Sequence, residues 1–169
     1  MHPLVHHGQR VLHRPCEPVT QFDGALAALV ADMFASMYAA DGVGLAANQI
    51  GVGLRVFVYD CPDAADTAQA GYVINPVLRI PGALAPPVTQ SEGCLSVPGQ
   101  HADIPRPALA TVTGQDLDGG EVVVTGTGLL ARCLQHEADH LDGIVYVDKL
   151  PAAQRAALLA AAARRIAGG

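Results

Sequence analysis

The sequence predicts an α+β fold in which small antiparallel β-sheets wrap around a central helix carrying metal ligands, with a further helix at the C-terminus. Three observations predict this architecture. Three segments show helical periodicity, the segments between them alternate like short strands separated by Gly and Pro, and one helical segment contains the pattern His-Glu-x-x-His. The 169 residues fit a single domain with a hydrophobic core, because half of them are apolar.

The clearest element of the N-terminal half is a helix from Asp23 to about Ala40. Asp23 suits the N-cap, and Asp41-Gly42 ends the helix. Apolar residues recur along one face at helical spacing: Leu26, Leu29, Val30, Met33 and Met37. We interpret the two methionines as core side chains, not as metal ligands. Upstream, Val11-Leu12 predicts a short strand, which the following prolines would stop.

The middle of the chain predicts short strands and turns. Strand-like alternation occurs at residues 55–60, 72–75, 77–80, 110–113 and 121–125. The last two strands form a hairpin through residues 118–120, whereas residues 62–71, rich in Ala and Asp, predict a surface loop. A final helix is expected from Pro151 to about Ala167, with Pro at the first helical position and Gly168 after the end.

The segment from Gln135 to Gly143 predicts a helix that carries a metal site. His136 and His140 lie four residues apart and project from one face, with Glu137 beside the first. Two imidazoles and a carboxylate in this spacing can hold a divalent cation and deprotonate a water. Gly143 stands at the C-cap position. The alternative is a surface helix with two solvated histidines.

A catalytic site of this kind needs a third protein ligand. In one extended motif the third ligand is a downstream histidine, but this chain has Tyr146 at that position. In another arrangement the third ligand is a downstream glutamate, but no Glu follows Glu137. The ligand is therefore expected upstream. Cys94 is the strongest candidate and His101 the alternative. The other cysteines without a proposed role, Cys16 and Cys61, are interpreted as small core residues.

Composition excludes several classes of protein. The net charge is −6 with a pI of about 5.5, and no Lys/Arg run suggests a DNA-binding surface. No apolar run approaches the length of a membrane span, and the His-rich N-terminus lacks the apolar core of a signal peptide. We therefore expect a cytoplasmic protein without a DNA or membrane partner.

Three segments stand in a characteristic order: Gly42 to Gln49, Glu92 to Ser96, and Gln135 to Gly143. Read alone, the first is either a tight turn or a loop that lets backbone approach a ligand. Together the three segments resemble peptide deformylase, the metallohydrolase that removes the formyl group from the N-terminal formylmethionine of new polypeptides and releases formate. The resemblance spans nearly the whole chain. It implies that residues 1–169 form one deformylase-like catalytic domain acting on N-formyl-methionyl nascent peptides.

The resemblance also implies the catalytic machinery. It makes Cys94, His136 and His140 the ligands of one divalent metal ion, Fe(II) in the first place, with zinc, nickel or cobalt as alternatives. It makes Glu137 the general base and the proton donor to the leaving amine.

Further roles follow from the same resemblance. Gln49 and the backbone N–H of Leu95 resemble the pair that binds the developing oxyanion. Residues expected to contact substrate are Val43, Gly44, Glu92, Leu129, Arg132 and Cys133.

We expect one ion pair near the proposed site, and three positions depart from the family's common pattern. Glu92 is expected to pair with Arg106 and so brace the loop that carries the cysteine ligand. Arg132 and Gln90 stand where apolar pocket residues are frequent in the family, and we expect Arg132 to lay its stem along the pocket with its head in water. His101 stands where many members carry an Arg that touches the peptide further along.

The His-Glu-x-x-His pattern is also compatible with two other functions. A metalloprotease cleaving internal peptide bonds is disfavoured because the sources of a downstream ligand are missing. A structural metal-binding module, or an inactive relative that holds nascent chains, is disfavoured because it would not need Glu137, Gln49 or Gly44.

The final helix has an unusual charge for this acidic chain. From Lys149 onward there are four basic residues and no acidic one. This predicts either an amphipathic helix that only covers the sheet or a helix that also contacts the ribosome through RNA phosphates.

Overall fold

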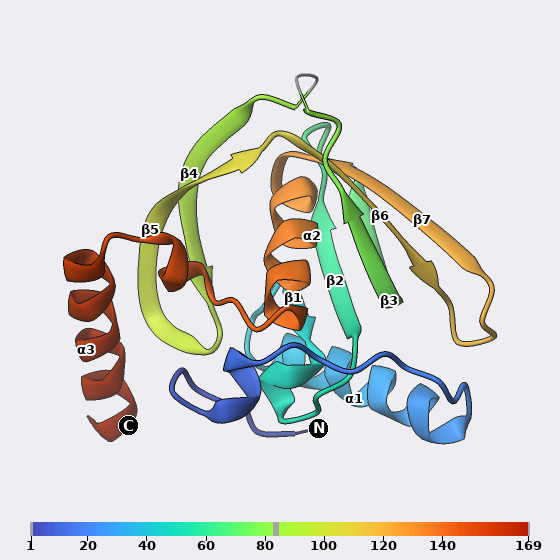
Figure 1. The fold of residues 1–169 in the computed structure, drawn as a ribbon, viewed down its shortest axis with the longest axis horizontal. Helices are drawn as coiled ribbons and strands as arrows, with labels where there is room; N and C mark the ends of the chain where they lie inside the picture. The colour runs from blue at the N-terminus through green and yellow to red at the C-terminus, as the bar shows by residue number, and fades with distance from the viewer. Residues whose placement is uncertain (1, 83–84, 169) are drawn as a thin grey trace.

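The structure, a computed structural model, describes residues 2–82 and 85–168. Within these residues it contains three α-helices and two antiparallel sheets (Figure 1). The helices are α1 (Gly24–Ala39), α2 (Gly128–Leu141) and α3 (Ala152–Gly168). One sheet has the order β1 (Gly44–Ala46), β2 (Val56–Pro62), β3 (Ala68–Arg79), β6 (Leu109–Gln115) and β7 (Glu121–Thr127). The other sheet pairs β4 (Pro87–Cys94) with β5 (Val97–Pro107).

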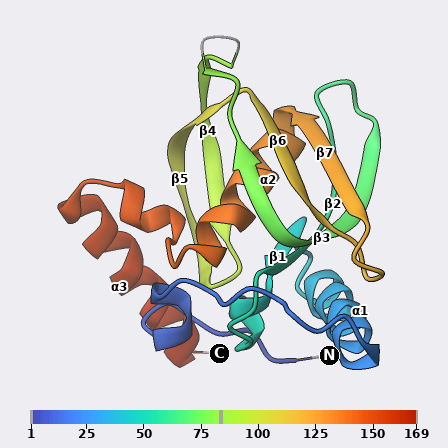
Figure 2. The same cartoon turned by 45° about the vertical axis from the view of Figure 1, so that its right-hand side comes forward.

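Helix α2 lies between the two sheets, with the β4–β5 ribbon on one side and the larger sheet on the other (Figures 1 and 2). Nearly every one of its side chains from position 130 onward is buried, as a helix enclosed by two layers requires. Its leucines at 130, 134 and 141 pack into the core formed with the large sheet. The predicted α+β fold around a central helix is confirmed.

The C-terminal end of α2 is closed by several hydrogen bonds. Gly143 has φ +79° and donates to the His140 carbonyl, while the next N–H donates to Asp139, which is the Schellman pattern expected of a C-terminal glycine. The Leu141 carbonyl accepts from the Arg55 guanidinium at 3.2 Å and from the backbone N–H of residue 16 at 2.8 Å. These bonds fix the last turn of α2, and His140 lies on that turn.

Helix α1 forms as the sequence predicts. The Asp23 carboxylate accepts from two backbone N–H groups at 3.0 and 3.1 Å, and Met33 and Met37 are fully buried in the core. The helix ends at Ala40, followed by Asp41 with a left-handed φ of 53°. The interpretation of both methionines as core residues is confirmed.

Three expectations about strands and loops need correction, and one pair of strands was not expected. Val11-Leu12 lies in a 3₁₀ helix, Arg10–His13, because the backbone N–H of the buried Leu12 donates to the Gln9 carbonyl three residues earlier. The loop after β2 is shorter than predicted, since Ala68 to Gly71 continue β3 opposite β2. The predicted strand pieces around Pro76 form one strand with a bulge. Strands β4 and β5 were not predicted.

The β4–β5 ribbon carries prolines that argue against a central strand. Among the described residues, its two strands pair only with each other, so prolines can occupy positions whose N–H would face outward. Helix α3 packs against β5, with Ala162 buried in the contact (Figure 2). It begins one residue after Pro151 and includes Gly168, a shift of about one residue from prediction. No helix in the described part of the chain is long and apolar enough to cross a bilayer.

Candidate active site

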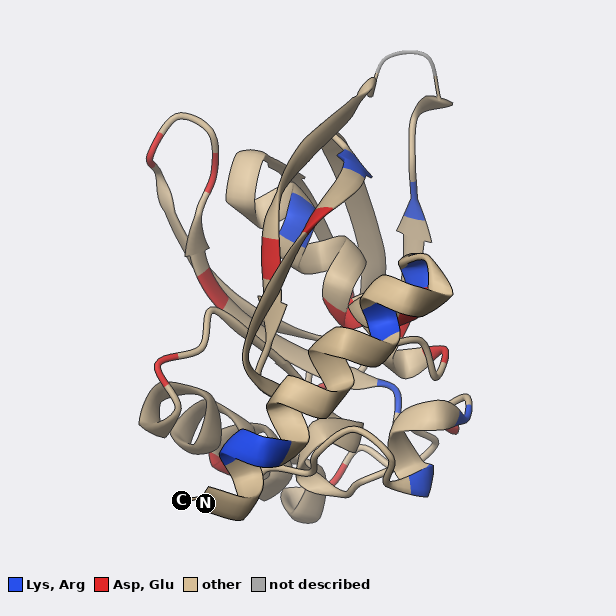
Figure 3. Cartoon of the chain, turned by 90° about the vertical axis from the view of Figure 1, so that its left-hand side faces the viewer, with Lys and Arg blue, Asp and Glu red and all other residues tan. Residues whose placement is uncertain are grey.

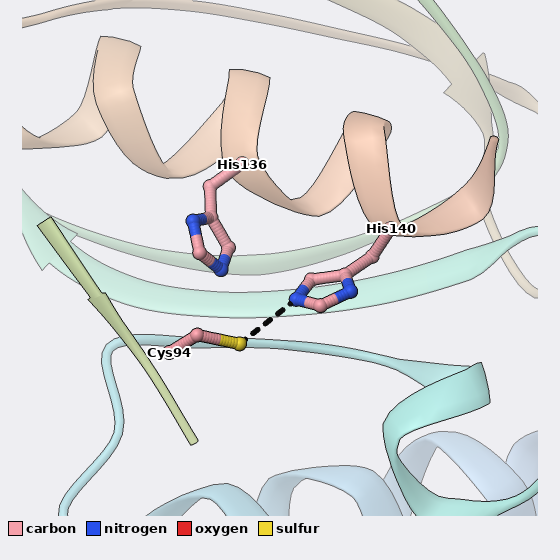
Figure 4. A group of neighbouring side chains, drawn as sticks. All are labelled: Cys94, His136 and His140. Atoms are coloured by element: carbon pink, nitrogen blue, oxygen red, sulfur yellow. Dashed lines mark hydrogen bonds between the residues drawn. The ribbon is translucent and has the colours of Figure 1, made fainter. Parts of the chain in front are cut away.

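Three side chains that could hold a metal ion meet where α2 faces the β4–β5 turn. One donor atom each from Cys94, His136 and His140 lies within 4.8 Å of the others, and the Cys94 sulfur is 3.1 Å from Nε2 of His140 (Figure 4). The two imidazoles come from successive turns of α2, and the cysteine ends β4. One thiolate and two imidazoles form a donor set that suits Fe, Zn, Ni or Co. The residues present therefore fit a divalent metal ion.

The two histidines differ in electrostatic setting. Burial holds the pKa of His140 well below its usual value, which keeps the ring neutral as metal ligation requires. Burial also acts to lower the pKa of His136, but hydrogen bonds with Cys94 and Glu92 outweigh it and raise that pKa. Because a metal competes with the proton on His136, binding is coupled to proton release.

Glu92 is a buried carboxylate shared by three donors. Arg106 donates to both of its oxygens at 2.6 and 2.9 Å, and Arg132 donates to one at 2.7 Å. The other oxygen is 2.7 Å from Nδ1 of His136. Burial disfavours the charged carboxyl, yet the hydrogen bonds with Arg106 and His136 hold the pKa of Glu92 well below its usual range. The predicted pairing of Glu92 with Arg106 is confirmed, and its consequence is an oriented His136 ring.

Arg132 differs from its predicted position. We expected the guanidinium in water, but the side chain is buried and also donates to the backbone carbonyls of Val88 and Ile104 at 2.9 and 3.0 Å. The carbonyls at the ribbon and the Glu92 carboxylate together outweigh solvation of the charge. Arg132 therefore links α2 to both strands of the β4–β5 ribbon. Gln90, the other polar residue at an expected pocket position, is exposed and does not line the cavity.

Glu137 projects from α2 into the space beside the three ligands. Burial raises its pKa to about 7, which suits a group that both accepts and returns a proton near neutral pH. Its Oε2 atom is buried and has no hydrogen-bond partner within the described chain. A Cβ on Gly44 would stand 2.5 Å from Oε1 of Glu137 and 2.7 Å from the Cys133 sulfur, so only glycine lets β1 come this close.

Gln49 occupies a fixed orientation beside the ligands. Its Oε1 accepts from the Ala46 backbone N–H at 2.9 Å, which directs Nε2 toward the Cys94 sulfur at 3.5 Å and the Ser96 hydroxyl at 3.2 Å. Leu95 lies in the two-residue turn directly after the cysteine. Ser96 was missed by sequence reasoning, because nothing in its neighbourhood signals that its fully buried hydroxyl would meet an amide from another element.

A cavity of about 510 Å³ joins these groups. Its lining includes nearly all the residues predicted to act on substrate or metal: Val43, Gly44, Gln49, Glu92, Cys94, Leu95, Leu129, Arg132, Cys133, His136 and Glu137. The two predicted residues outside the lining are His140 and Arg106, which stand behind it. His6, His101 and Arg165 also line the cavity, and of these only His101 had a predicted role.

Replacing Glu92 by Gln tests whether this carboxylate supports the ligand set. The change keeps side-chain volume but leaves buried Arg132 without its counter-charge, and leaves Arg106 with Asp139 as its only acidic partner among the described residues. We expect a loss of about 3–5 kcal/mol in the free energy of unfolding and a 10–100-fold weaker metal affinity. Chemical denaturation and chelator competition measure these two quantities.

The matched control is Asp103→Asn, which removes an exposed carboxylate from the neighbouring strand. It should stay within about 0.5 kcal/mol of the parent. Parent-like metal affinity in Glu92→Gln would show that Glu92 does not orient His136 for metal binding.

Comparison with known proteins agrees with this geometry. The family model described as polypeptide deformylase matches residues 1–156. Peptide deformylase 2 of Streptomyces avermitilis is 55% identical over 162 residues, covering 96% of this chain and 86% of that protein. Peptide deformylase 2 of Streptomyces coelicolor is 52% identical over 162 residues, covering 96% and 89%. The crystal structure of peptide deformylase from Ehrlichia chaffeensis has a TM-score of 0.92 at 33% identity and covers 99% of this chain and 98% of its own. The chain belongs to the peptide deformylase family.

Proposed function

We propose that this chain hydrolyses the formyl group from N-formyl-methionyl peptides, releasing formate and a free amine, and that residues 1–169 act as one catalytic domain. The observation that carries the proposal is the convergence of Cys94, His136 and His140, beside a cavity where an oxygen of Glu137 is buried without a partner in the described chain. A closed structural metal site needs no such carboxylate. The geometry therefore favours a hydrolase over a structural module.

The reaction needs an activated water and a stabilised oxyanion. A divalent ion held by the three ligands supplies Lewis-acid polarisation of the formyl oxygen and lowers the pKa of water. Glu137 takes the proton from the attacking water as the oxygen bonds to the formyl carbon. It then delivers that proton to the amine nitrogen as the C–N bond breaks. A pKa of about 7 allows the carboxyl to serve both steps.

The negative charge that develops on the formyl oxygen needs preorganised donors. Gln49 Nε2 and the backbone N–H of Leu95 are proposed as these donors, since both line the cavity next to Cys94. The Ala46 N–H holds the Gln49 amide in place before substrate arrives. A donor oriented in advance stabilises the transition state by about 3 kcal/mol.

The methionine side chain requires an apolar recess. Val43, Leu129 and Cys133 line the cavity and are proposed to contact it, and burying one methionine contributes about 1.5–3 kcal/mol. A hydrogen bond with Cys61, together with burial, raises the pKa of Cys133 well above its usual value, so this thiol stays neutral and apolar. Gly44 is proposed to pair with the peptide backbone in strand fashion.

The ion itself is proposed to be Fe(II), with zinc, nickel or cobalt able to replace it. The soft thiolate and two imidazoles bind all of these ions. The family resemblance favours iron.

Replacing Glu137 by Gln separates catalysis from metal binding. Formate release from formyl-Met-Ala-Ser should fall by roughly 10²–10⁴-fold because the proton acceptor is lost. Metal per chain should match the parent, because Glu137 is not a ligand. A matched His136→Ala variant should lose metal and activity together.

The same assay distinguishes the candidate activities of the parent. Formyl-Met-Ala-Ser should be hydrolysed, whereas acetyl-Met-Ala-Ser and an internal peptide bond should not. Cleavage of the internal bond would favour the metalloprotease. If Glu137→Gln lost as much metal as His136→Ala, the assignment of Glu137 as the base and not a ligand would be contradicted.

Cys94 should determine how the metal site responds to air. A thiolate next to an open position is oxidisable, so the iron-loaded protein should lose formate release in air, and nickel or cobalt loading should slow the loss. Cys94→Ser should bind metal more weakly, because a neutral hydroxyl replaces a soft anion. Metal analysis and formate release, before and after air exposure of anaerobically loaded protein, measure both effects.

A suitable control is Cys16→Ser, which removes a buried thiol far from the ligand set in sequence and outside the cavity lining. If Cys94→Ser bound metal and turned over like the parent, the third ligand would have to be another donor, with His101 the first to examine.

We also propose that α3 contacts the ribosome. Arg164 and Arg165 lie on its exposed C-terminal turns, whereas Lys149 and Arg155 are already paired with acids at 3.0 and 3.6 Å (Figure 3). The end of α3 thus carries the charge available to RNA phosphates.

The double variant Arg164→Gln/Arg165→Gln tests this contact without removing the helix, whose Ala162 packs against β5. Ribosome co-sedimentation should weaken, and the slope of log affinity against log salt should fall by up to about two units. An unchanged slope would discard the ribosome contact.

A further inference from the structure

The C-terminal helix brings one arginine to the mouth of the catalytic cavity. Arg165, on the last turns of α3, is part of the cavity lining although α3 lies on the outer side of β5 (Figures 1 and 3). No other residue of α3 lines that cavity. The helix that covers the ribbon therefore also contributes a charge to the site.

Gly99 of β5 determines where the Arg165 side chain lies. A Cβ built on Gly99 would be 2.8 Å from Cδ, 3.0 Å from Nε and 3.1 Å from Nη1 of Arg165. Any larger residue would push the guanidinium away, and the φ of +71° at this position also favours glycine. The arginine is thus seated on the backbone of the ribbon, not extended freely into solvent.

The charges around the cavity leave Arg165 available to a ligand. Arg132, the other arginine of the lining, is committed to Glu92. Arg165 is exposed and has no salt bridge or hydrogen bond to any residue that the structure describes. The acids of the lining are Glu92, Glu137 and Asp41, of which Asp41 belongs to the α1–β1 connection.

The cavity lining also contains two imidazoles. His101 lies across Gly93, where a Cβ would be 2.6 Å from its ring, and His6 comes from the N-terminal segment. Gln100, which follows Gly99 in the chain, also lines the cavity. The mouth near Arg165 therefore offers several hydrogen-bond donors and one permanent positive charge, which matches a carboxylate.

We propose that Arg165 is a specificity-determining residue that binds an acidic side chain of the formylated peptide, downstream of the methionine. This inference rests on the proposed deformylase function and adds a preference within it. The methionine recess and the catalytic groups take the start of the peptide. The rest of an extended peptide, rising about 3.3 Å per residue, must leave through the mouth that Arg165 lines. An exposed ion pair of this kind changes kcat/KM by about two- to fivefold.

The test compares matched peptide pairs on the metal-loaded full chain. Asp or Asn is placed at the second, third or fourth position of C-terminally amidated formyl-Met peptides of Ala. The readout is the ratio of kcat/KM for the Asp peptide to that for the Asn peptide. In the parent, the ratio should favour Asp by about two- to fivefold in at least one register, through KM. Higher salt should reduce it.

Variants assign the preference to one side chain. Arg165→Gln should abolish the preference for the Asp peptide in that register, because the positive charge is lost. Arg165→Lys should retain part of the preference. Arg164→Gln, which removes the adjacent exposed charge outside the lining, should keep the parent ratio.

Equal ratios in the parent and Arg165→Gln in every register would overturn the inference while leaving the deformylase function intact. Equal loss in Arg164→Gln and Arg165→Gln would overturn it in favour of a diffuse charge effect. Absence of formate release by the parent from every Asn peptide would instead overturn the proposed function, and this inference with it.

Discussion

The buried carboxylate of Glu92 is the interaction on which the rest of the site depends. It accepts from Arg106 and Arg132 and fixes Nδ1 of His136, all at 2.6–2.9 Å. Arg106 in turn binds Asp139 of α2 at 2.6 Å. A charge this deeply buried is tolerable only because its partners are charged and well aligned. The same bonds join the β4–β5 ribbon to α2, so the strand carrying one proposed ligand is held against the helix carrying the other two.

The position of the proposed catalytic groups explains why helix α2 is enclosed by two sheets. Helix α2 supplies two of the proposed ligands and Glu137 in two successive turns, and its last turn is closed by Arg55 and Gly143. Strand β1 passes close to Glu137 because Gly44 has no side chain. The active groups are thereby held by regular elements, which limits the rearrangement needed during reaction.

The sequence predicted α1, α2 and the β6–β7 hairpin because each has a strong periodic pattern and a specific end signal, such as Asp23 or Gly143. Residue chemistry and family resemblance predicted the three proposed ligands, and the structure brings their donor atoms together. The β4–β5 ribbon was not predicted because its prolines are typical of loops. They fit a strand here because, among the described residues, β4 and β5 pair only with each other. The buried state of Arg132 and the arrival of Arg165 at the cavity depend on contacts between distant segments, which local patterns do not contain.

The central claim is that Cys94, His136 and His140 together hold a divalent ion beside Glu137. X-ray absorption spectroscopy of the zinc- or iron-loaded protein tests it most directly, because sulfur and nitrogen ligands scatter differently and no activity is required. The account predicts one sulfur and two histidine nitrogens, with the sulfur contribution lost in Cys94→Ser. A ligand shell of nitrogen and oxygen alone in the parent would contradict the account.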